Sequence, residues 1–266
     1  MTQEARVALD HNVPKGCIGR EYAGDGLTLR GWSCAARGPR RGSVVYLDGV
    51  ADNRSSAVGV IDWLTQRGFA VVAYDSRAHG QSDGGVCTYG FYERRDLKHV
   101  IDSLPRGPVL SMGNSLGGAV AIQGAVGNER VVGVIAAEAF SDLRTIAIER
   151  APRFLPRPVI ARAFRVAEEQ GHFDVDAVSP AVAAASLRIP VLLIHGANDV
   201  DTRPEHSRRI FAALKGPKQL LLVPGAGHNQ SLNSPVAWAE IERWLSAFVR
   251  AESITAEPRT QTHGTQ

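Results

Sequence analysis

The chain has 266 residues, of which 44% are hydrophobic and 21% are charged. These fractions exclude a disordered chain, a coiled coil and a mini-protein held together by disulfides, and the length is that of one to two domains with a sizeable core. The net charge of +3 is too close to balance to indicate nucleic acid or an anionic membrane surface as a partner.

Short apolar segments rich in β-branched residues recur along the chain, bounded by Gly, Pro, Asp or Asn. They predict buried strands at residues 43–47, 70–74, 109–112, 131–137, 191–194 and 220–223. Segments of helical periodicity alternate with them, at residues 56–67, 93–104, 116–126, 204–214 and 234–250. This alternation is typical of βαβ units, and it predicts an α/β fold in which a mostly parallel central sheet carries helices on both faces.

One long segment interrupts the alternation. Residues 140–188 contain several prolines, a helical stretch at 159–169 and apolar side chains such as Phe154. A connection of this length usually has a function of its own, so we expect a small helical cap insertion over one end of the sheet. We expect one domain over residues 1–250 and a flexible, polar C-terminal tail at 251–266.

The cysteines and the apolar segments bear on location. Cys17, Cys34 and Cys87 are widely spaced, odd in number and not arranged as a CxxC pair. We therefore expect reduced thiols in a cytoplasmic protein. The first residues lack the basic and apolar regions of a signal peptide, and the longest apolar segments, such as 131–137, fall far short of the roughly 18 residues that span a bilayer.

The segment after the predicted strand at 109–112 carries a nucleophile motif. Residues 113–117 read Gly-Asn-Ser-Leu-Gly, which fits G-x-S-x-G, and a predicted helix begins at once. A sharp turn from strand to helix exposes the Ser115 hydroxyl at the helix N-terminus, where the N–H of Leu116 is free to donate to an oxyanion. The alternative, a glycine-rich turn that holds a serine by chance, is disfavoured by the position of the motif between a strand and a helix.

A nucleophilic serine needs a base and an acid, which follow it in the order Ser, Asp/Glu, His in this architecture. His228 is the histidine that lies late in the chain in a glycine-rich loop after a strand. The loop after the preceding strand offers Asp199, with Asp201 as the alternative, although Asp201 lies nearer the next helix and suits a capping role. For the other histidines, including His79 and His195, we expect surface or structural roles.

Six segments in this order resemble the α/β-hydrolase superfamily, and most closely its serine-aminopeptidase and monoacylglycerol-lipase-like branch. They are residues 47–54, 74–82, 88–93, 113–118, 195–199 and 224–228. The resemblance implies a Ser115, His228 and Asp199 triad that needs no cofactor and no metal. It also implies oxyanion-hole donors in the backbone N–H groups of Val50 and Leu116, and a cap over the active site in the insertion.

Asp48 departs from the pattern of this branch, whose members usually carry histidine before the glycine of the first motif. A carboxylate beside an oxyanion hole opposes a developing negative charge if it points inward. We expect Asp48 to turn away, toward Arg54 or Arg77; the alternatives are that it is protonated or that activity is weakened. On this view Asp48→His leaves activity within about tenfold.

The resulting hypothesis is a serine hydrolase that cleaves a small-molecule carboxylic ester through an acyl-enzyme intermediate. An acyltransferase, a thioesterase or an aminopeptidase would use the same triad, and a non-catalytic small-molecule binding protein remains the alternative from another class. Asp48, Tyr89, Phe91 and Phe154 are candidates for the substrate pocket. The sequence does not indicate the oligomeric state of the protein.

Arginines gather in the expected cap insertion, where acidic residues are few. They are Arg144, Arg150, Arg153, Arg157, Arg162 and Arg165. We expect them to form a solvated helix face, rather than a site that steers anionic acyl groups.

Overall fold

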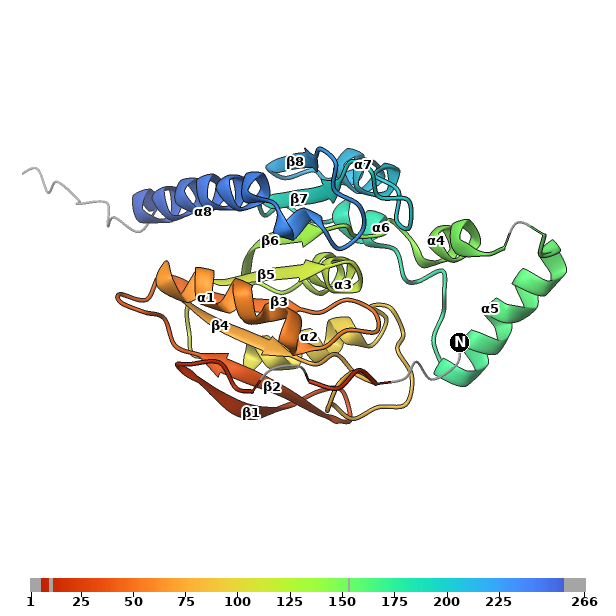
Figure 1. The fold of residues 1–266 in the computed structure, drawn as a ribbon, viewed down its shortest axis with the longest axis horizontal. Helices are drawn as coiled ribbons and strands as arrows, with labels where there is room; N and C mark the ends of the chain where they lie inside the picture. Colours follow the sequence, from red (N-terminus) through yellow and green to blue (C-terminus); the bar gives the residue numbers. More distant parts are fainter. Residues whose placement is uncertain (1–5, 10–11, 153, 256–266) are drawn as a thin grey trace, which may run out of the picture.

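The computed structural model describes residues 6–9, 12–152 and 154–255, and an eight-stranded sheet crosses the centre of the molecule (Figure 1). The strands are β1 (Cys17–Ala23), β2 (Thr28–Cys34), β3 (Gly42–Leu47), β4 (Phe69–Tyr74), β5 (Val109–Asn114), β6 (Val131–Ala137), β7 (Val191–Gly196) and β8 (Lys218–Val223). They lie in the order β1-β2-β4-β3-β5-β6-β7-β8. The six strands from β3 to β8 are parallel, whereas β1 and β2 form an antiparallel hairpin that pairs antiparallel to β4.

Helices cover both faces of the sheet. They are α1 (Val58–Gln66), α2 (Glu93–Asp102), α3 (Leu116–Gly124), α4 (Leu143–Arg150), α5 (Arg157–Gly171), α6 (Pro180–Ala184), α7 (Glu205–Ala213) and α8 (Pro235–Thr255), with short 3-10 helices η1 (Arg54–Ala57) and η2 (Ser231–Asn233). One core cluster joins the sheet to α2, α3 and α7, and a second joins the opposite face to α1 and α8. The predicted fold class is confirmed.

The side chains of β3 show how one strand serves both cores. Val45 and Leu47 point into the cluster beneath α2 and α3, whereas Val44 and Tyr46 point into the cluster beneath α1 and α8. A strand buried on both faces is apolar at every position, because successive side chains alternate between the faces. The sequence reveals β3 to β8 for this reason, and all six predicted strands are confirmed.

The hairpin β1–β2 was not predicted. Most of β1 is exposed, so its sequence mixes polar and apolar residues and lacks a continuous apolar segment. β1 occupies the edge of the sheet, where only one side of the strand is paired. Such a strand carries a weaker sequence signal than a central one.

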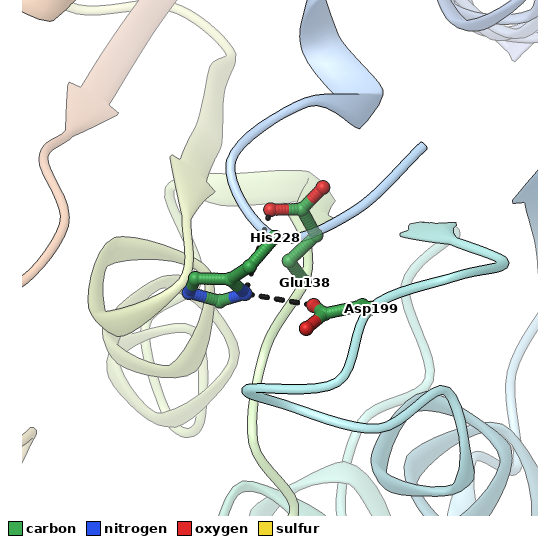
Figure 2. Close-up of side chains that lie close together, drawn as sticks. All are labelled: Glu138, Asp199 and His228. Carbon is green, nitrogen blue, oxygen red and sulfur yellow. Dashed lines mark hydrogen bonds and ion pairs between the residues drawn. The ribbon is translucent and has the colours of Figure 1, made fainter. Parts of the chain in front are cut away.

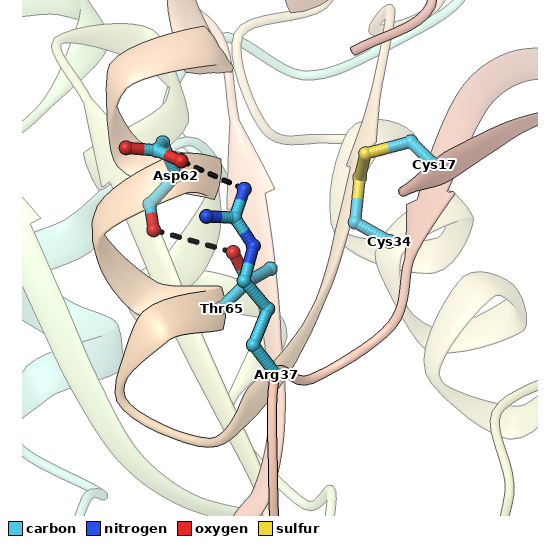
Figure 3. Close-up of a disulfide and its surroundings, with 5 residues drawn as sticks. All are labelled: Cys17, Cys34, Arg37, Asp62 and Thr65. Carbon is cyan, nitrogen blue, oxygen red and sulfur yellow. Dashed lines mark hydrogen bonds and ion pairs between the residues drawn. A yellow bond between two sulfur atoms is a disulfide. The ribbon is translucent and has the colours of Figure 1, made fainter. Parts of the chain in front are cut away.

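A disulfide joins the two strands of this hairpin (Figure 3). Cys17 and Cys34 are direct partners in the register of β1 and β2, and their Cα atoms are 4.0 Å apart. The expectation of three reduced thiols is therefore wrong for this pair, since the strand register brings together residues 17 positions apart. Cys87 is not part of a disulfide. The cytoplasmic location stays a prediction and loses the support of these two thiols.

The segment expected to form the cap contains α4, α5 and α6. In Figure 1, α5 projects away from the sheet, and only Ala167 and Gly171 of its residues are buried. The helix α6, by contrast, packs against α3 and α7 as part of the main body. Only the middle of the segment, around α5, therefore stands apart from the sheet, and its role as a cap stays a prediction.

The expected arginine cluster divides between α4 and α5. Arg157, Arg162 and Arg165 on α5 are exposed, as the expected solvated face requires. On α4, Arg144 forms an ion pair with Asp176, whereas Arg150 bonds to the backbone carbonyl of Asp201 and the hydroxyl of Thr202. Arg153 lies outside the described residues.

The C-terminal helix is longer than predicted. The expected helix ends at residue 250, whereas α8 continues to Thr255, so the first five residues of the expected tail are helical. Residues 256–266, the rest of that tail, lie outside the described residues. Among the helices that the structure describes, none combines the length and the apolar character needed to cross a membrane.

Candidate active site

Ser115 lies in the sharp turn between β5 and α3. Its φ and ψ angles are 51° and −112°, in a region that non-glycine residues rarely adopt. The glycines on either side are required by close packing: a Cβ at Gly113 would overlap the backbone of Gly117, and a Cβ at Gly117 would overlap the carbonyl oxygen of Leu47. The two glycines therefore allow the start of α3 to pack closely against the end of β3, with Ser115 in the turn at this contact.

Three predicted residues from distant parts of the chain meet at this turn. The Oγ atom of Ser115 lies 3.1 Å from Nε2 of His228, which follows β8. The Nδ1 atom of His228 lies 2.7 Å from Oδ2 of Asp199, in the loop after β7. These distances describe a continuous hydrogen-bonded chain of hydroxyl, imidazole and carboxylate.

Asp199, rather than Asp201, is the carboxylate in contact with His228. Its side chain is fully buried, and its Oδ1 atom accepts hydrogen bonds from the backbone N–H groups of Asp201 and Thr202. Burial alone would raise the pKa of Asp199, but hydrogen bonds with His195, His228 and the Thr202 amide outweigh it and hold the pKa well below its usual range. Asp199 is therefore ionised and fixed in orientation.

A second histidine, His195, contacts the Asp199 carboxylate. Its ring is fully buried, with Nδ1 2.6 Å from the Ser207 hydroxyl and Nε2 2.6 Å from the Thr202 carbonyl oxygen. The same Nε2 atom lies 3.3 Å from Oδ2 of Asp199. His195 thus has a structural role, as expected, and this role includes a contact with the Asp199 carboxylate.

The two residues predicted to donate to an oxyanion lie near Ser115. Leu116 is the first residue of α3, where a backbone N–H has no partner within the helix. Val50 lines the same cavity as Ser115 and follows Gly49, where a Cβ would lie 3.8 Å from the Ser115 Cβ atom. Both residues are next to the nucleophile, which the proposed role requires.

Asp48 turns away from the cavity, as expected, but it does not contact Arg54 or Arg77, so that part of the prediction is wrong. Its Oδ1 atom accepts a hydrogen bond of 2.5 Å from the Ser76 hydroxyl, and its Oδ2 atom is buried without a hydrogen-bond partner. Arg54 pairs with Asp75, and Arg77 pairs with Asp96, so neither arginine is available to Asp48.

The surroundings of Asp48 favour its protonated form. Burial raises the pKa of Asp48 to about 7, against the opposing effects of His79 and of the Ser76 hydrogen bond. Protonation was one of the alternatives left open by the sequence. A neutral carboxylic acid behind the oxyanion loop opposes a developing negative charge much less than a carboxylate does.

Ser115 and His228 open into a cavity of about 1030 Å³ that runs across the carboxyl ends of the strands. Residues of α1 and α8 line one part of the cavity, which we call the aromatic arm. Residues of α4 and of the loop after β7 line another part, the charged arm. The aromatic arm is lined by Tyr46, Val60, Trp63, Leu232 and Trp238. The charged arm is lined by Glu149, Arg150, Val200, Asp201 and Arg203.

None of the four residues expected in the substrate pocket lines this cavity. Tyr89 and Phe91 pack against the core beneath α2, Phe154 is 84% exposed, and Asp48 lies behind the oxyanion loop. This cavity therefore gives no support to their role in substrate binding, which stays a prediction. The sequence places Trp63 and Trp238 on helices but does not show that their rings meet, with centroids 4.7 Å apart, at the wall of this cavity.

Glu138, which directly follows β6, is a further residue of the site that the sequence did not predict. Its side chain is fully buried, and its Oε2 atom lies 3.7 Å from Nδ1 of His228 (Figure 2). The sequence feature that could have identified Glu138 is its place as an acidic residue immediately after the buried apolar strand at 131–137.

Glu138, Asp199 and His228 are also the described group whose ligand atoms lie close enough together to hold a metal ion. All three side chains are already engaged: His228 bridges Ser115 and Asp199, and Glu138 accepts two backbone hydrogen bonds. A metal bound here would displace the Asp199–His228 hydrogen bond. The donor set therefore fits a hydrogen-bonded site better than a metal site.

Fold and site together define a class of protein. The chain belongs to the alpha/beta hydrolase family, whose model matches residues 55–241. This confirms the expected superfamily, and the finer placement in the serine-aminopeptidase and monoacylglycerol-lipase-like branch stays a prediction.

Individual relatives resemble the chain to different extents. It is 30% identical over 218 residues to the uncharacterized protein YfhR of Escherichia coli O157:H7, covering 77% of this chain and 71% of that protein. It is 30% identical over 97 residues to the mitochondrial palmitoyl-protein thioesterase ABHD10 of Mus musculus, covering 35% of this chain and 32% of that one. Among solved structures, the Pyrococcus furiosus esterase Pf2001 shares the fold with a TM-score of 0.72 at 23% identity, covering 92% of this chain and 97% of that one.

Proposed function

We propose that the protein is a serine hydrolase that cleaves small-molecule carboxylic esters through an acyl-enzyme intermediate. The observation that carries the proposal is the chain of contacts from Ser115 through His228 to Asp199, at 3.1 Å and 2.7 Å, at the wall of a large cavity. A serine hydroxyl is a weak nucleophile unless a base in hydrogen-bond contact removes its proton, and the base works best when a third group orients it.

The acylation step follows from this geometry. Nε2 of His228 accepts the proton of Ser115 as Oγ attacks the ester carbonyl, and Nδ1–H stays bonded to ionised Asp199. The imidazolium then donates its proton to the leaving alcohol as the tetrahedral intermediate collapses. Water enters as the alcohol leaves, gives a proton to the same nitrogen and attacks the acyl carbon. The proton then passes from His228 to Ser115 Oγ as the acyl–oxygen bond breaks and the carboxylic acid leaves.

The negative charge on the tetrahedral intermediate needs donors fixed in advance. We assign this role to the backbone N–H groups of Val50, which lines the same cavity as Ser115, and of Leu116, which follows Ser115 at the N-terminus of α3. Donors held rigidly at such a site contribute roughly 3 kcal/mol each to transition-state stabilisation.

A thioesterase is the second candidate function, because the mouse relative is named a palmitoyl-protein thioesterase. Acyl transfer to an alcohol or amine, and aminopeptidase activity, would use the same residues with a different acceptor or substrate. A non-catalytic binding protein would have no use for the aligned hydroxyl, imidazole and carboxylate. These alternatives differ in product, so product analysis separates them.

The test of the proposed function pairs Ser115→Ala with Ser186→Ala, an exposed serine remote from the cavity. We expect the wild-type protein and the control to react with a fluorophosphonate probe and to hydrolyse p-nitrophenyl acetate. We expect Ser115→Ala to lose labelling and at least about a thousandfold in kcat. Turnover retained in Ser115→Ala would contradict the assignment.

The acceptor and substrate class need a second measurement. An oxyester and a thioester of the same acyl group, together with an amino-acid anilide, are compared by kcat/KM on the same preparation. A ratio above about ten in favour of the oxyester supports the ester assignment, and a preference for the thioester favours the second candidate.

A further inference from the structure

Glu138 is a buried acid beside the base of the site, with no part in the mechanism above. It directly follows β6, and its side chain is 0% exposed. Its Oε1 atom accepts a 2.9 Å hydrogen bond from the backbone N–H of Ser231, and its Oε2 atom accepts one from the backbone N–H of Asn229. Both donors belong to the loop that carries His228.

Figure 2 shows the carboxyl groups of Glu138 and Asp199 approaching the same nitrogen of the His228 ring from two directions. Nδ1 lies 2.7 Å from Asp199 Oδ2 and 3.7 Å from Glu138 Oε2. A buried carboxylate is costly unless hydrogen bonds and a positive charge compensate it. The two loop amides supply the hydrogen bonds, and protonated His228 would supply the charge.

The backbone of Glu138 supports a functional reason for its position. Its φ angle is 53°, and Asn229, to which it bonds, has a φ angle of 59°. Non-glycine residues in this region are uncommon and gather where the surrounding structure holds them for function. Ser115, with a φ angle of 51°, is another such residue at this site.

We propose that Glu138 is a positioning residue for His228 and a second carboxylate that stabilises its protonated form. Its two backbone hydrogen bonds hold the loop, and its charge adds to that of Asp199 when His228 takes the proton of Ser115. In this role Glu138 exchanges no proton with His228 or with the substrate. The inference rests on the proposed function.

The geometry also allows Glu138 to replace Asp199 in part as the partner of His228. If Asp199 is removed, the Nδ1–H group of His228 can turn to Glu138 after a movement of under about 1 Å, from 3.7 Å to hydrogen-bond distance. The two carboxylates then replace each other in part, so their removal is non-additive.

Other charged groups face His228 from the elements around it. The cavity wall contributes Asp52, Glu149, Arg150, Asp201 and Arg203, and His195 lies behind Asp199. Within the described part of the chain, Asp199 and Glu138 are the carboxylates whose ion-pair contacts reach His228. Removing the charge of Glu138 should therefore affect the His228 ring more than removing the charge of any of these cavity-wall residues.

Glu93 provides a matched control. It is also a buried glutamate whose carboxylate holds a loop, accepting 2.7 Å hydrogen bonds from the backbone N–H groups of Thr88 and Gly90, but it does not contact His228. Glu93→Gln thus reports the effect of losing a buried carboxylate that braces a loop.

The experiment compares Glu138→Gln, Glu93→Gln, Asp199→Ala and the double variant Glu138→Gln/Asp199→Ala. We expect Glu138→Gln to lower kcat/KM about tenfold and to move the acid limb of its pH profile down by about one pH unit, because the protonated imidazole loses a neighbouring negative charge. Glu93→Gln should leave that limb in place. In the Asp199→Ala background, Glu138→Gln should cost at least about a hundredfold.

A titration of the His228 ring by NMR in the resting protein provides a readout that needs no turnover. Its midpoint should fall by about one pH unit in Glu138→Gln and stay unchanged in Glu93→Gln. Glu138→Asp, which keeps the charge but withdraws it by one C–C bond, should give a smaller shift in the same direction. This variant carries the test if Glu138→Gln does not fold.

The inference is overturned if the NMR midpoint is the same in wild type, Glu138→Gln and Glu138→Asp, or if the cost of Glu138→Gln is equal in both backgrounds. Failure of the proposed function looks different: Ser115→Ala would retain turnover, or the wild type would neither label nor hydrolyse esters. In that case the NMR titration alone still decides whether Glu138 acts on His228.

Discussion

Asp199 and Asp48 are both buried acids near Ser115, yet their surroundings shift their pKa values in opposite directions. Asp199 accepts two backbone hydrogen bonds and contacts two histidine rings, which holds its pKa well below the usual range despite burial. Asp48 has a single hydroxyl donor, so burial dominates and raises its pKa to about 7. The number of donors around a buried carboxyl group, more than its depth, decides its charge.

The raised pKa of Asp48 predicts a pH dependence of stability. A carboxyl group with a higher pKa in the folded than in the unfolded state binds more protons when folded, so its contribution to stability falls as pH rises from about 4 to about 7. Asp48→Asn removes this loss. We expect its free energy of unfolding, relative to wild type, to improve by about 2–3 kcal/mol between pH 5 and pH 8.

Urea denaturation at pH 5 and pH 8 measures this change. Asp62→Asn, on the exposed face of α1, is the control and should show no comparable trend. A difference between Asp48→Asn and wild type that is the same at both pH values would contradict the assignment of a raised pKa.

At the scale of single residues, motif and chain order identified the members of the site but not all their neighbours. Ser115, Asp199 and His228 follow strands in the order that the architecture requires, so their meeting could be predicted. The partner of Asp48 could not, because it depends on which carboxylates the nearby arginines already bind. Glu138 was missed because an acid after a strand has no motif until the His228 loop folds over it.

The turn from β5 to α3 depends on glycine where backbone meets backbone. A Cβ at Gly117 would overlap the Leu47 carbonyl and lie 2.7 Å from the Asp48 carbonyl oxygen, and neither atom belongs to a side chain that could move. We expect Gly117→Ala to destabilise the fold by more than about 3 kcal/mol. Gly59→Ala, on α1 where a Cβ meets nothing within 4 Å, should instead stabilise it by up to about 1 kcal/mol.

Thermal and urea unfolding of the two glycine variants provide the comparison. Equal stability of Gly117→Ala and wild type would mean that α3 can move away from β3. Such movement would also displace Ser115, so fluorophosphonate labelling serves as a second readout.

The hairpin β1–β2 is held by its disulfide as well as by pairing to β4. A cross-link over 17 residues restricts the unfolded chain and contributes about 3 kcal/mol. We expect Cys17→Ser to lower the free energy of unfolding by about 2–3 kcal/mol, and Cys87→Ser to lower it less. Ser115 labelling should survive in Cys17→Ser, because β5 to β8, which carry the site, lie beyond β4 and β3 in the sheet.

Counting thiols in the denatured protein tests the disulfide directly. Without reductant one thiol should react, and after reduction all three should react. Three reactive thiols before reduction, in protein purified under oxidising conditions, would contradict the disulfide.

At the scale of the whole molecule, the site exists because loops from several strand ends meet at one edge of the sheet. Ser115 follows β5, Glu138 follows β6, Asp199 follows β7 and His228 follows β8. Parallel strands bring their carboxyl ends to the same edge, which is where ligands bind in such sheets. The cavity then extends from this edge between α1 and α8, which cover the same face.

The aromatic arm of the cavity should select substrates by their apolar group. The rings of Trp63 and Trp238 are in contact, with centroids 4.7 Å apart, and both line this arm. We expect Trp63→Ala to lower kcat/KM about tenfold for a phenylacetate ester and less than threefold for the acetate ester, since only the larger group reaches the indole. Phe154→Ala, at an 84% exposed position, should change neither value. Equal losses for both esters in Trp63→Ala would place the acyl group elsewhere.

The sequence by itself determined the central strands of the sheet, the alternation of helices and the chain order of Ser115, Asp199 and His228. Buried strands, amphipathic helices and strand-end motifs are local patterns. Only the tertiary structure decided the Cys17–Cys34 disulfide, the partner of Asp48, the wall of the cavity and the place of Glu138. Each of these depends on the register or packing of segments distant in the chain. Such contacts are fixed by how elements fit together, and no single segment encodes them.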